Sequence, residues 1–160
     1  MTTIYLIRHA EAEGNLYRIA QGQYNSLLTD RGQRQVAALE RLGVQCLFPR
    51  EQFQMFCPVT AEKQAALAAD YARLLTEIDA RAADCFLVVL DEGADAFAGD
   101  LLPRQALLDF LQRHGKDREI ILTGHSLPAD LAPLCDYVTR MTKERHPFDT
   151  GAPARRGIEY

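Results

Sequence analysis

The chain has little that would connect it with a membrane, with nucleic acid or with an oxidising compartment. Its 160 residues carry a formal net charge of −4, whereas nucleic-acid binding usually needs a basic surface. Its four cysteines form no Cys-x-x-Cys pair, so a cysteine metal site is disfavoured and reduced thiols are expected. The apolar run before Arg8 is too short for a secretory leader or a membrane span. We therefore expect a cytoplasmic protein that binds neither nucleic acid nor a membrane.

The composition is that of an ordinary soluble globular domain, with 48% hydrophobic and 25% charged residues. A chain of this length fits one compact domain that buries about two-thirds of its unfolded surface. No internal repeat or low-complexity linker interrupts the sequence. A change of pattern near residues 43–52 indicates a join between two segments of different ancestry, 1–43 and 44–160, within one domain.

Apolar runs and helical periodicities alternate along the chain. The apolar runs are predicted strands, at residues 4–7, 44–48, 85–90, 119–123 and 136–141. The periodic stretches are predicted helices, at residues 30–42, 61–83, 103–114 and 129–134. Thr29 and Thr60 are good N-caps for the first two helices, and a loop is expected after Asp91. This alternation predicts an α/β fold with a mostly parallel sheet and flanking helices.

Polar residues follow three of the predicted strands. Arg8-His9, Asp91-Glu92 and Gly124-His125 each come directly after an apolar run. Ligands of parallel α/β sheets bind beyond the carboxyl ends of the strands. We therefore expect these three pairs to lie at the ligand-binding edge of the sheet.

The first pair, Arg8-His9, suits phosphoryl transfer, because a neutral imidazole can attack phosphorus while a guanidinium binds the non-bridging oxygens. Together with Asn15, Gln21-Gly22 and the run at residues 28–35, it resembles the histidine phosphatase superfamily over about residues 1–35. The resemblance implies that His9 is the phosphorylated nucleophile. Arg8 and Asn15 would line the pocket for the phosphate of an α-ribazole phosphate-like substrate, and Gln21 and Gly22 would belong to the substrate-side loop.

The same superfamily also needs a second pocket arginine, an acid for the leaving group and a second histidine. No second arginine motif is found in the sequence. His125 is superficially like the second histidine, since it also follows a predicted strand; alternatively, it is a loop residue that replaces something else. We expect phosphatase catalysis to be slow when some of these catalytic groups are lacking, because they act as a unit.

From about residue 35 onward the chain resembles the ATP:corrinoid adenosyltransferases. The most specific matches are His146-Pro-Phe-Asp149 and Gly157-Ile-Glu-Tyr160, supported by a Walker-B-like strand end at Leu87–Glu92. The resemblance implies a P-loop-NTPase-like architecture, truncated here, and transfer of adenosyl from ATP to cob(I)alamin or cob(I)yrinic acid diamide. It also implies Mg²⁺, small-molecule substrates (ATP and a corrinoid) and a homodimer.

Site residues follow from this resemblance. Glu92 would bind Mg²⁺ beside the nucleotide phosphates, with Asp91 in support. Phe53, Phe56 and His146 would lie on the corrinoid side. Simpler interpretations stay open, since acids at strand ends are often only solvated, aromatic loop residues often pack, and His146 can anchor the tail.

Two departures from the adenosyltransferase pattern concern phosphate binding. No Gly-x-x-x-x-Gly-Lys-Ser/Thr motif occurs in these 160 residues, so the backbone nest and its lysine are absent. After Leu-Thr-Gly, where the adenosyltransferase pattern has an arginine, this chain has His125, so a permanently charged side chain is absent at that position. Three functions therefore stay open. They are an adenosyltransferase-family protein impaired by the missing loop, a histidine phosphatase acting through His9, and a non-catalytic module that binds a corrinoid or a partner.

Overall fold

A computed structural model of the chain describes residues 29–51 and 60–152. These residues belong to two compact units. Among them, one unit comprises residues 29–46 and 143–152, and the other comprises residues 47–51 and 60–142. The predicted strand at residues 4–7 lies outside the described residues. The predicted join of ancestry near residue 43 stays a prediction.

The second unit is built on two parallel strands. β1 covers Leu87–Leu90 and β2 covers Glu119–Leu122, with Leu87 opposite Glu119 and Leu90 opposite Leu122. The connection between the strands contains two helices, α4 (Gly93–Ala98) and α5 (Arg104–His114). A parallel pair joined through helices confirms the predicted α/β class.

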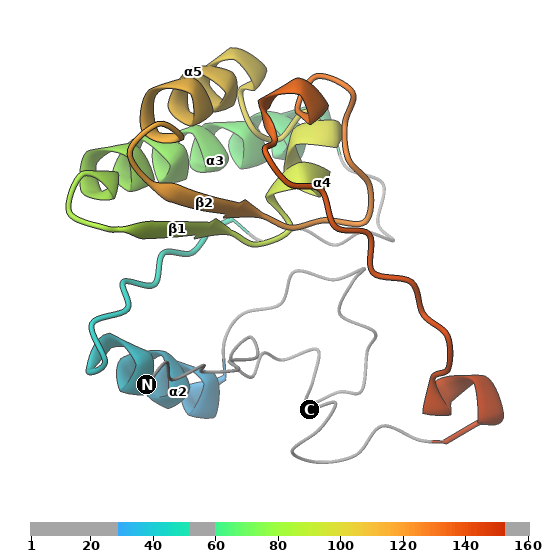
Figure 1. The fold of residues 1–160 in the computed structure, drawn as a ribbon. Coiled ribbons are helices and arrows are strands. Elements are labelled where there is room, and N and C mark those ends of the chain that lie inside the picture. The colour runs from blue at the N-terminus through green and yellow to red at the C-terminus, as the bar shows by residue number, and fades with distance from the viewer. Residues whose placement is uncertain (1–28, 52–59, 153–160) are drawn as a thin grey trace, which may run out of the picture. The chain divides into compact units, whose positions relative to one another are not determined.

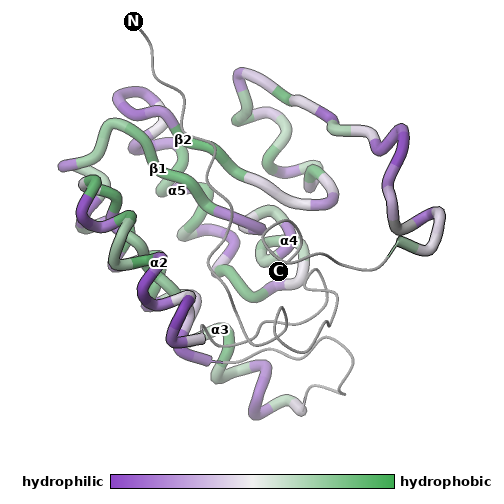
Figure 2. The backbone as a smooth tube through the Cα atoms, turned by 90° about the horizontal axis from the view of Figure 1, so that it is seen from below, coloured by the Kyte–Doolittle hydropathy of each residue, from purple (hydrophilic) through white to green (hydrophobic). Residues whose placement is uncertain are grey.

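Helices cover one face of this small sheet. α3 (Ala61–Ala82) and α5 pack against each other beside the strands (Figure 1). The side chains that this packing buries completely are Phe97, Phe110, Leu67, Leu107 and Leu131. Both strands are largely hydrophobic (Figure 2), yet Val89 is 53% exposed and Ile121 is 48% exposed. The strand predicted at residues 85–90 is thus present as β1, and its alternate side chains point away from the helices.

α3 is the longest described helix and ends within one residue of its predicted bounds. The Thr60 hydroxyl caps its start by accepting a hydrogen bond from the backbone N–H of Lys63 at 3.2 Å. Arg118 caps its end, since the guanidinium donates from Nε to the Ala82 carbonyl at 3.0 Å and from Nη2 to the Ala83 carbonyl at 2.8 Å. The local cap at Thr60 explains why the sequence alone located the start of this helix, whereas the cap at its end comes from a residue 36 positions after Ala82.

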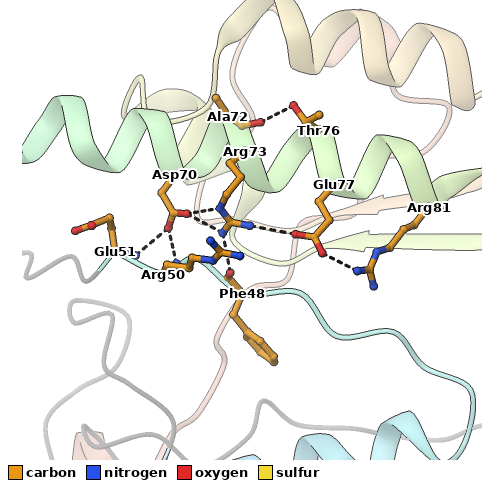
Figure 3. A network of polar contacts seen from close by, with 9 residues as sticks. All are labelled: Phe48, Arg50, Glu51, Asp70, Ala72, Arg73, Thr76, Glu77 and Arg81. Carbon is orange, nitrogen blue, oxygen red and sulfur yellow. Dashed lines mark hydrogen bonds and ion pairs between the residues drawn. The ribbon is translucent and has the colours of Figure 1, made fainter.

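α3 also holds the segment Leu47–Glu51 through the carboxylate of Asp70 (Figure 3). Asp70 accepts hydrogen bonds from the backbone N–H of Arg50 and from that of Glu51, the latter at 2.8 Å. Arg73 donates to the other carboxylate oxygen of Asp70 at 2.8 Å. A side chain of the helix therefore satisfies backbone groups that a sheet would otherwise pair.

Two predicted strands are absent from the described residues. No strand forms at residues 44–48, where the Phe48 carbonyl faces Arg73 at 3.4 Å instead of a neighbouring strand. None forms at residues 136–141 either, and Tyr137 is 92% exposed there. Both predictions fail for one reason: an apolar run becomes a strand only where a partner strand is present.

Two further differences concern short helices of the second unit. The loop expected after Asp91 is helix α4, because Ala94, Ala96 and Phe97 all pack into the core. The helix expected at residues 129–134 shortens to a 3₁₀ turn, η2 (Ala132–Leu134). Helix α5 agrees with its prediction and ends before Gly115.

The first unit contributes α2 (Asp30–Glu40) and the 3₁₀ turn η3 (Pro147–Thr150). The Thr29 hydroxyl caps α2 by accepting from the backbone N–H of Gly32 at 3.1 Å, as predicted. Gly43 follows the helix with φ of +84°, a conformation that glycine adopts readily. None of the described helices is both long and apolar enough to cross a membrane.

Candidate functional site

The carboxyl ends of β1 and β2 bring Asp91-Glu92 and Thr123–His125 to one edge. The parallel register continues one step past the strands, where the backbone N–H of Thr123 donates to the Leu90 carbonyl at 3.2 Å. Two of the three polar pairs predicted at this edge, Asp91-Glu92 and Gly124-His125, therefore lie together. Arg8-His9 lies outside the described residues.

The Thr123 hydroxyl connects the two strand ends. Its oxygen accepts a hydrogen bond from the backbone N–H of Glu92 at 2.8 Å. The same hydroxyl donates to Oδ1 of Asp91 at 2.7 Å. The end of β1 is thereby tied to the end of β2 through one side chain.

Glu92 occupies an unusual backbone conformation. Its φ of +52° and ψ of +18° are left-handed, which costs a non-glycine residue about 1–2 kcal/mol. At the next residue, Gly93, a Cβ would lie 2.7 Å from Cδ1 of Leu122 and 3.0 Å from Cβ of Leu90, so these side chains would have to shift. The Glu92 carboxylate is exposed and accepts no hydrogen bond from the described residues. Strained backbone of this kind is concentrated at functional sites.

His125 lies on the same edge and is held by Asp95 of α4. Oδ2 of Asp95 accepts from the backbone N–H of His125 at 3.0 Å and lies 2.9 Å from its Nδ1. The hydrogen bond and the charge of Asp95 raise the pKa of His125, and the charge of Glu92 adds to the effect. The imidazole side chain is 71% exposed, so its Nε2 is accessible to a ligand. Asp95 therefore favours a cationic imidazole at this edge.

Close packing fixes α4 against the end of β2. A Cβ at Gly124 would lie 2.7 Å from Cβ of Ala94 and 3.2 Å from the Asp95 carboxylate. The backbone N–H of Ala94 donates to the Thr123 carbonyl at 3.1 Å. These contacts place Asp95 beside His125.

The carboxylates at this edge fit a phosphate-bound Mg²⁺ better than a resident metal. Among residues 29–51 and 60–152, no three His, Cys, Asp or Glu side chains gather as a metal site would need. Mg²⁺, however, usually keeps several waters and takes one or two carboxylates together with substrate phosphates. Glu92 and Asp91 would supply that number of protein ligands.

Tyr71 of α3 lies within electrostatic reach of this edge. Burial is the largest influence that raises the pKa of its phenol, and the charges of Glu92 and Asp70 follow. The phenol therefore stays neutral at physiological pH and can act only through hydrogen bonds.

The remaining predicted site residues stay predictions. His146 belongs to the first unit, where its carbonyl accepts from the backbone N–H of Asp149 at 3.0 Å. The others lie outside the described residues: Arg8, His9, Asn15, Gln21, Gly22, Phe53 and Phe56.

The sequence analysis missed Thr123 and Asp95. Both had a usable signal: Thr123 directly follows the last residue of β2, and Asp95 lies three residues after Glu92, close to one helical turn. Asp95 was overlooked because its segment was interpreted as a loop.

A family model matches most of the chain. The family model described as ATP:corrinoid adenosyltransferase BtuR/CobO/CobP matches residues 10–160. The match therefore includes most of the stretch that resembles histidine phosphatases.

Curated relatives match a shorter part of the chain. The Corrinoid adenosyltransferase CobA of Salmonella typhimurium is 34% identical over 74 residues, which are 46% of this chain and 38% of that protein. The Corrinoid adenosyltransferase of Escherichia coli K12 is 32% identical over 74 residues, which are again 46% of this chain and 38% of that protein. The Corrinoid adenosyltransferase of Sinorhizobium sp is 32% identical over 75 residues, which are 46% of this chain and 35% of that protein. The match thus spans less than two-fifths of each relative. Because the family model covers far more than half of the sequence, the chain belongs to the ATP:corrinoid adenosyltransferase BtuR/CobO/CobP family.

Proposed function

We propose that the protein binds Mg²⁺-ATP at the carboxyl edge of β1 and β2 and transfers adenosyl to a reduced corrinoid, cob(I)alamin or cob(I)yrinic acid diamide. Membership of the family supports the reaction type. The observation that carries the proposal is Glu92, whose carboxylate stands at the end of β1 without a hydrogen bond from the described residues. A ligand-binding edge in an α/β fold is the expected place for such a group.

The chain's own residues divide the work at this edge. Mg²⁺, when bound, would neutralise phosphate charge. Glu92 would be its protein ligand, and Asp91, held by Thr123, would support it. His125, whose pKa Asp95 raises, would place a cation near the same phosphates.

The absence of a phosphate loop in the sequence limits how tightly nucleotide can bind. Its backbone N–H groups and lysine normally provide most of the phosphate contacts. We therefore expect weak Mg²⁺-ATP binding that depends strongly on the carboxylates. Arg8 is the amino-terminal cation that would compensate.

Calorimetric titration with Mg²⁺-ATP tests the proposal. The variants are Glu92→Gln and, as a matched control, Glu119→Gln, because Glu119 is an exposed acid at the opposite end of β2. We expect saturable binding to the wild type and to the control, and a loss of at least about tenfold in affinity for Glu92→Gln. Equal affinity in all three proteins would contradict a metal role for Glu92.

The corrinoid side of the proposal rests on Phe53, Phe56 and His146. Their roles come from the resemblance described above. A Phe53→Ala, Phe56→Ala double variant should raise the KM for the corrinoid and leave the KM for ATP unchanged. A change in the ATP value alone would contradict this assignment.

A histidine phosphatase acting through His9, with Arg8 and Asn15 in its pocket, is the second candidate. The observation that favours it is His125, whose Nδ1 is held by Asp95 while Nε2 stays accessible, as a second phosphatase histidine would require. It predicts phosphate release from a phosphate monoester that His9→Ala abolishes and Glu92→Ala leaves intact. Saturable corrinoid binding without either turnover would instead identify a non-catalytic binding module.

We also propose that the protein is a homodimer, as the family resemblance implies. Light scattering coupled to gel filtration measures this directly. A mass near 36 kDa, twice the 18.0 kDa of the chain, is expected; a mass near that of one chain at working concentration would contradict it.

A further inference from the structure

We propose that Thr123 is a positioning residue that sets the direction of the Asp91 and Glu92 carboxylates toward a divalent cation. This inference rests on the proposed function, in which those carboxylates bind phosphate-bound Mg²⁺. No motif and no comparison assigns a role to this side chain.

The hydrogen bonds of the hydroxyl define its role. A threonine hydroxyl has one proton to donate and lone pairs with which to accept. Thr123 uses the proton on Oδ1 of Asp91 at 2.7 Å and a lone pair on the backbone N–H of Glu92 at 2.8 Å. Because the two partners are successive residues, one side chain fixes both the rotamer of Asp91 and the peptide that leads into Glu92.

Thr123 also holds the turn that directs Glu92. The left-handed conformation of Glu92 lets its carbonyl accept from the backbone N–H groups of Asp95 and Ala96, both at 3.1 Å, and so begins α4. The Thr123 carbonyl accepts a hydrogen bond from the backbone N–H of Ala94, two residues after Glu92, at 3.1 Å. Hydroxyl and carbonyl of one residue on β2 therefore hold the unusual turn from two sides.

The arrangement leaves carboxylate oxygens available to a cation. Oδ1 of Asp91 is engaged by Thr123, whereas Oδ2 of Asp91 and both carboxylate oxygens of Glu92 accept no hydrogen bond from the described residues. Carboxylates that bind metals are themselves usually held by hydrogen bonds from neighbouring groups. Thr123 supplies that hold.

The test removes the hydroxyl and keeps the shape. Thr123→Val has nearly the same volume and neither hydrogen bond, while Thr123→Ser restores both. Mn²⁺-ATP is the probe, because its enhancement of the water proton relaxation rate increases when the complex binds to the protein, whereas Mn²⁺-ATP free in solution shows no such increase. Thr76→Val is the control, because the Thr76 hydroxyl only donates to the Ala72 carbonyl on the surface of α3.

We expect Thr123→Val to weaken Mn²⁺-ATP binding about 10- to 100-fold, the usual effect of losing a group that orients a metal ligand. Thr123→Ser and Thr76→Val should bind Mn²⁺-ATP like the wild type. Thermal unfolding without metal is measured for each protein, and binding is compared well below the transition, so that reduced stability alone does not change the result. If Thr123→Val does not fold, Thr123→Ala against Thr123→Ser makes the same comparison.

The outcomes separate this inference from the proposed function. Wild-type Mn²⁺-ATP affinity in Thr123→Val, together with a loss in Glu92→Gln, would overturn the role of Thr123 and leave the metal site standing. Failure of Glu92→Gln to reduce Mn²⁺-ATP binding, or no Mn²⁺-ATP binding by the wild type, would overturn both.

Discussion

Asp70 is a carboxylate of α3 that is only 8% exposed, and it binds two backbone N–H groups and Arg73 at once. Burial alone would raise the pKa of this carboxyl. The hydrogen bonds from Glu51, Arg73 and Arg50 outweigh burial and hold the pKa below its ordinary value. The folded state therefore favours the ionised form of Asp70 more than the unfolded state does.

Asp70→Asn should lower the free energy of unfolding at pH 7 by about 2 kcal/mol, because the amide cannot accept all of these hydrogen bonds and leaves buried donors unpaired. A lowered folded pKa means that the stabilisation is present above the unfolded pKa, about 4, and is lost as the pH falls through the folded pKa. Urea denaturation at pH 7 and pH 3 measures both effects. The exposed Asp84→Asn serves as control, and a difference that persists unchanged at pH 3 would contradict the interpretation.

At His125, Asp95→Asn should lower the pKa of the imidazole, since Asp95 supplies the hydrogen bond and the charge that raise it. Titration of the His125 ring by nuclear magnetic resonance measures the shift, and His125→Gln identifies its signal. Because the folded pKa is raised, the contribution of this pair to stability is complete below the unfolded pKa, about 6.5, and disappears as the pH rises through the folded pKa. An unchanged titration in Asp95→Asn would show that the ion pair does not form in solution.

At the scale of single elements, Arg118 joins the end of α3 to the beginning of β2. Its guanidinium donates to the Ala82 and Ala83 carbonyls, two of the groups that a helix leaves unpaired at its end. Arg118→Ala should lower the free energy of unfolding by about 1.5 kcal/mol. Lys116→Ala, an exposed residue in the same turn, should change it by less than about 0.5 kcal/mol. Chemical denaturation of both variants decides the point, and equal effects would contradict the capping role.

The packing of α4 against β2 can be tested with Gly124→Ala. The added methyl group would lie 2.7 Å from Cβ of Ala94, so the helix or the strand end must shift. Overpacking of this kind usually costs about 1–3 kcal/mol. Because the shift moves Asp95 relative to His125, the variant should also lower the pKa of His125. A stable variant with an unchanged His125 titration would argue against this coupling.

Elements with local signals could be predicted from the sequence, and those that depend on distant partners could not. Thr29 and Thr60 cap helices through their own hydroxyls, so α2 and α3 follow from a few neighbouring residues. The apolar run at residues 44–48 has strand composition, but Asp70 and Arg73 on α3 bind the backbone around residues 48–51. α4 begins after Glu92, a residue in the left-handed conformation whose side chain makes no capping hydrogen bond, so no capping pattern in the sequence predicts this helix.

At the scale of the whole molecule, the carboxyl-edge rule located part of the candidate site. It placed Asp91, Glu92 and His125 correctly at one edge because parallel pairing is enough to bring strand ends together. It missed Thr123, which lies within the predicted strand at residues 119–123, and Asp95, which lies in a predicted loop; their importance comes from hydrogen bonds across the two strand ends and α4. Residues on the amino-terminal side, Arg8 and His9 among them, stay predictions.

The central claim is that this edge supports adenosyl transfer although these 160 residues contain no Gly-x-x-x-x-Gly-Lys-Ser/Thr motif. The most direct measurement is the formation of an adenosylated corrinoid from Mg²⁺-ATP and a chemically reduced corrinoid, followed by its absorption spectrum, for the wild type, Glu92→Gln and Glu119→Gln. We predict slow product formation by the wild type and Glu119→Gln, with a rate at least about tenfold lower in Glu92→Gln. Absence of adenosylated product from the wild type at millimolar ATP, or equal rates in all three proteins, would contradict the claim.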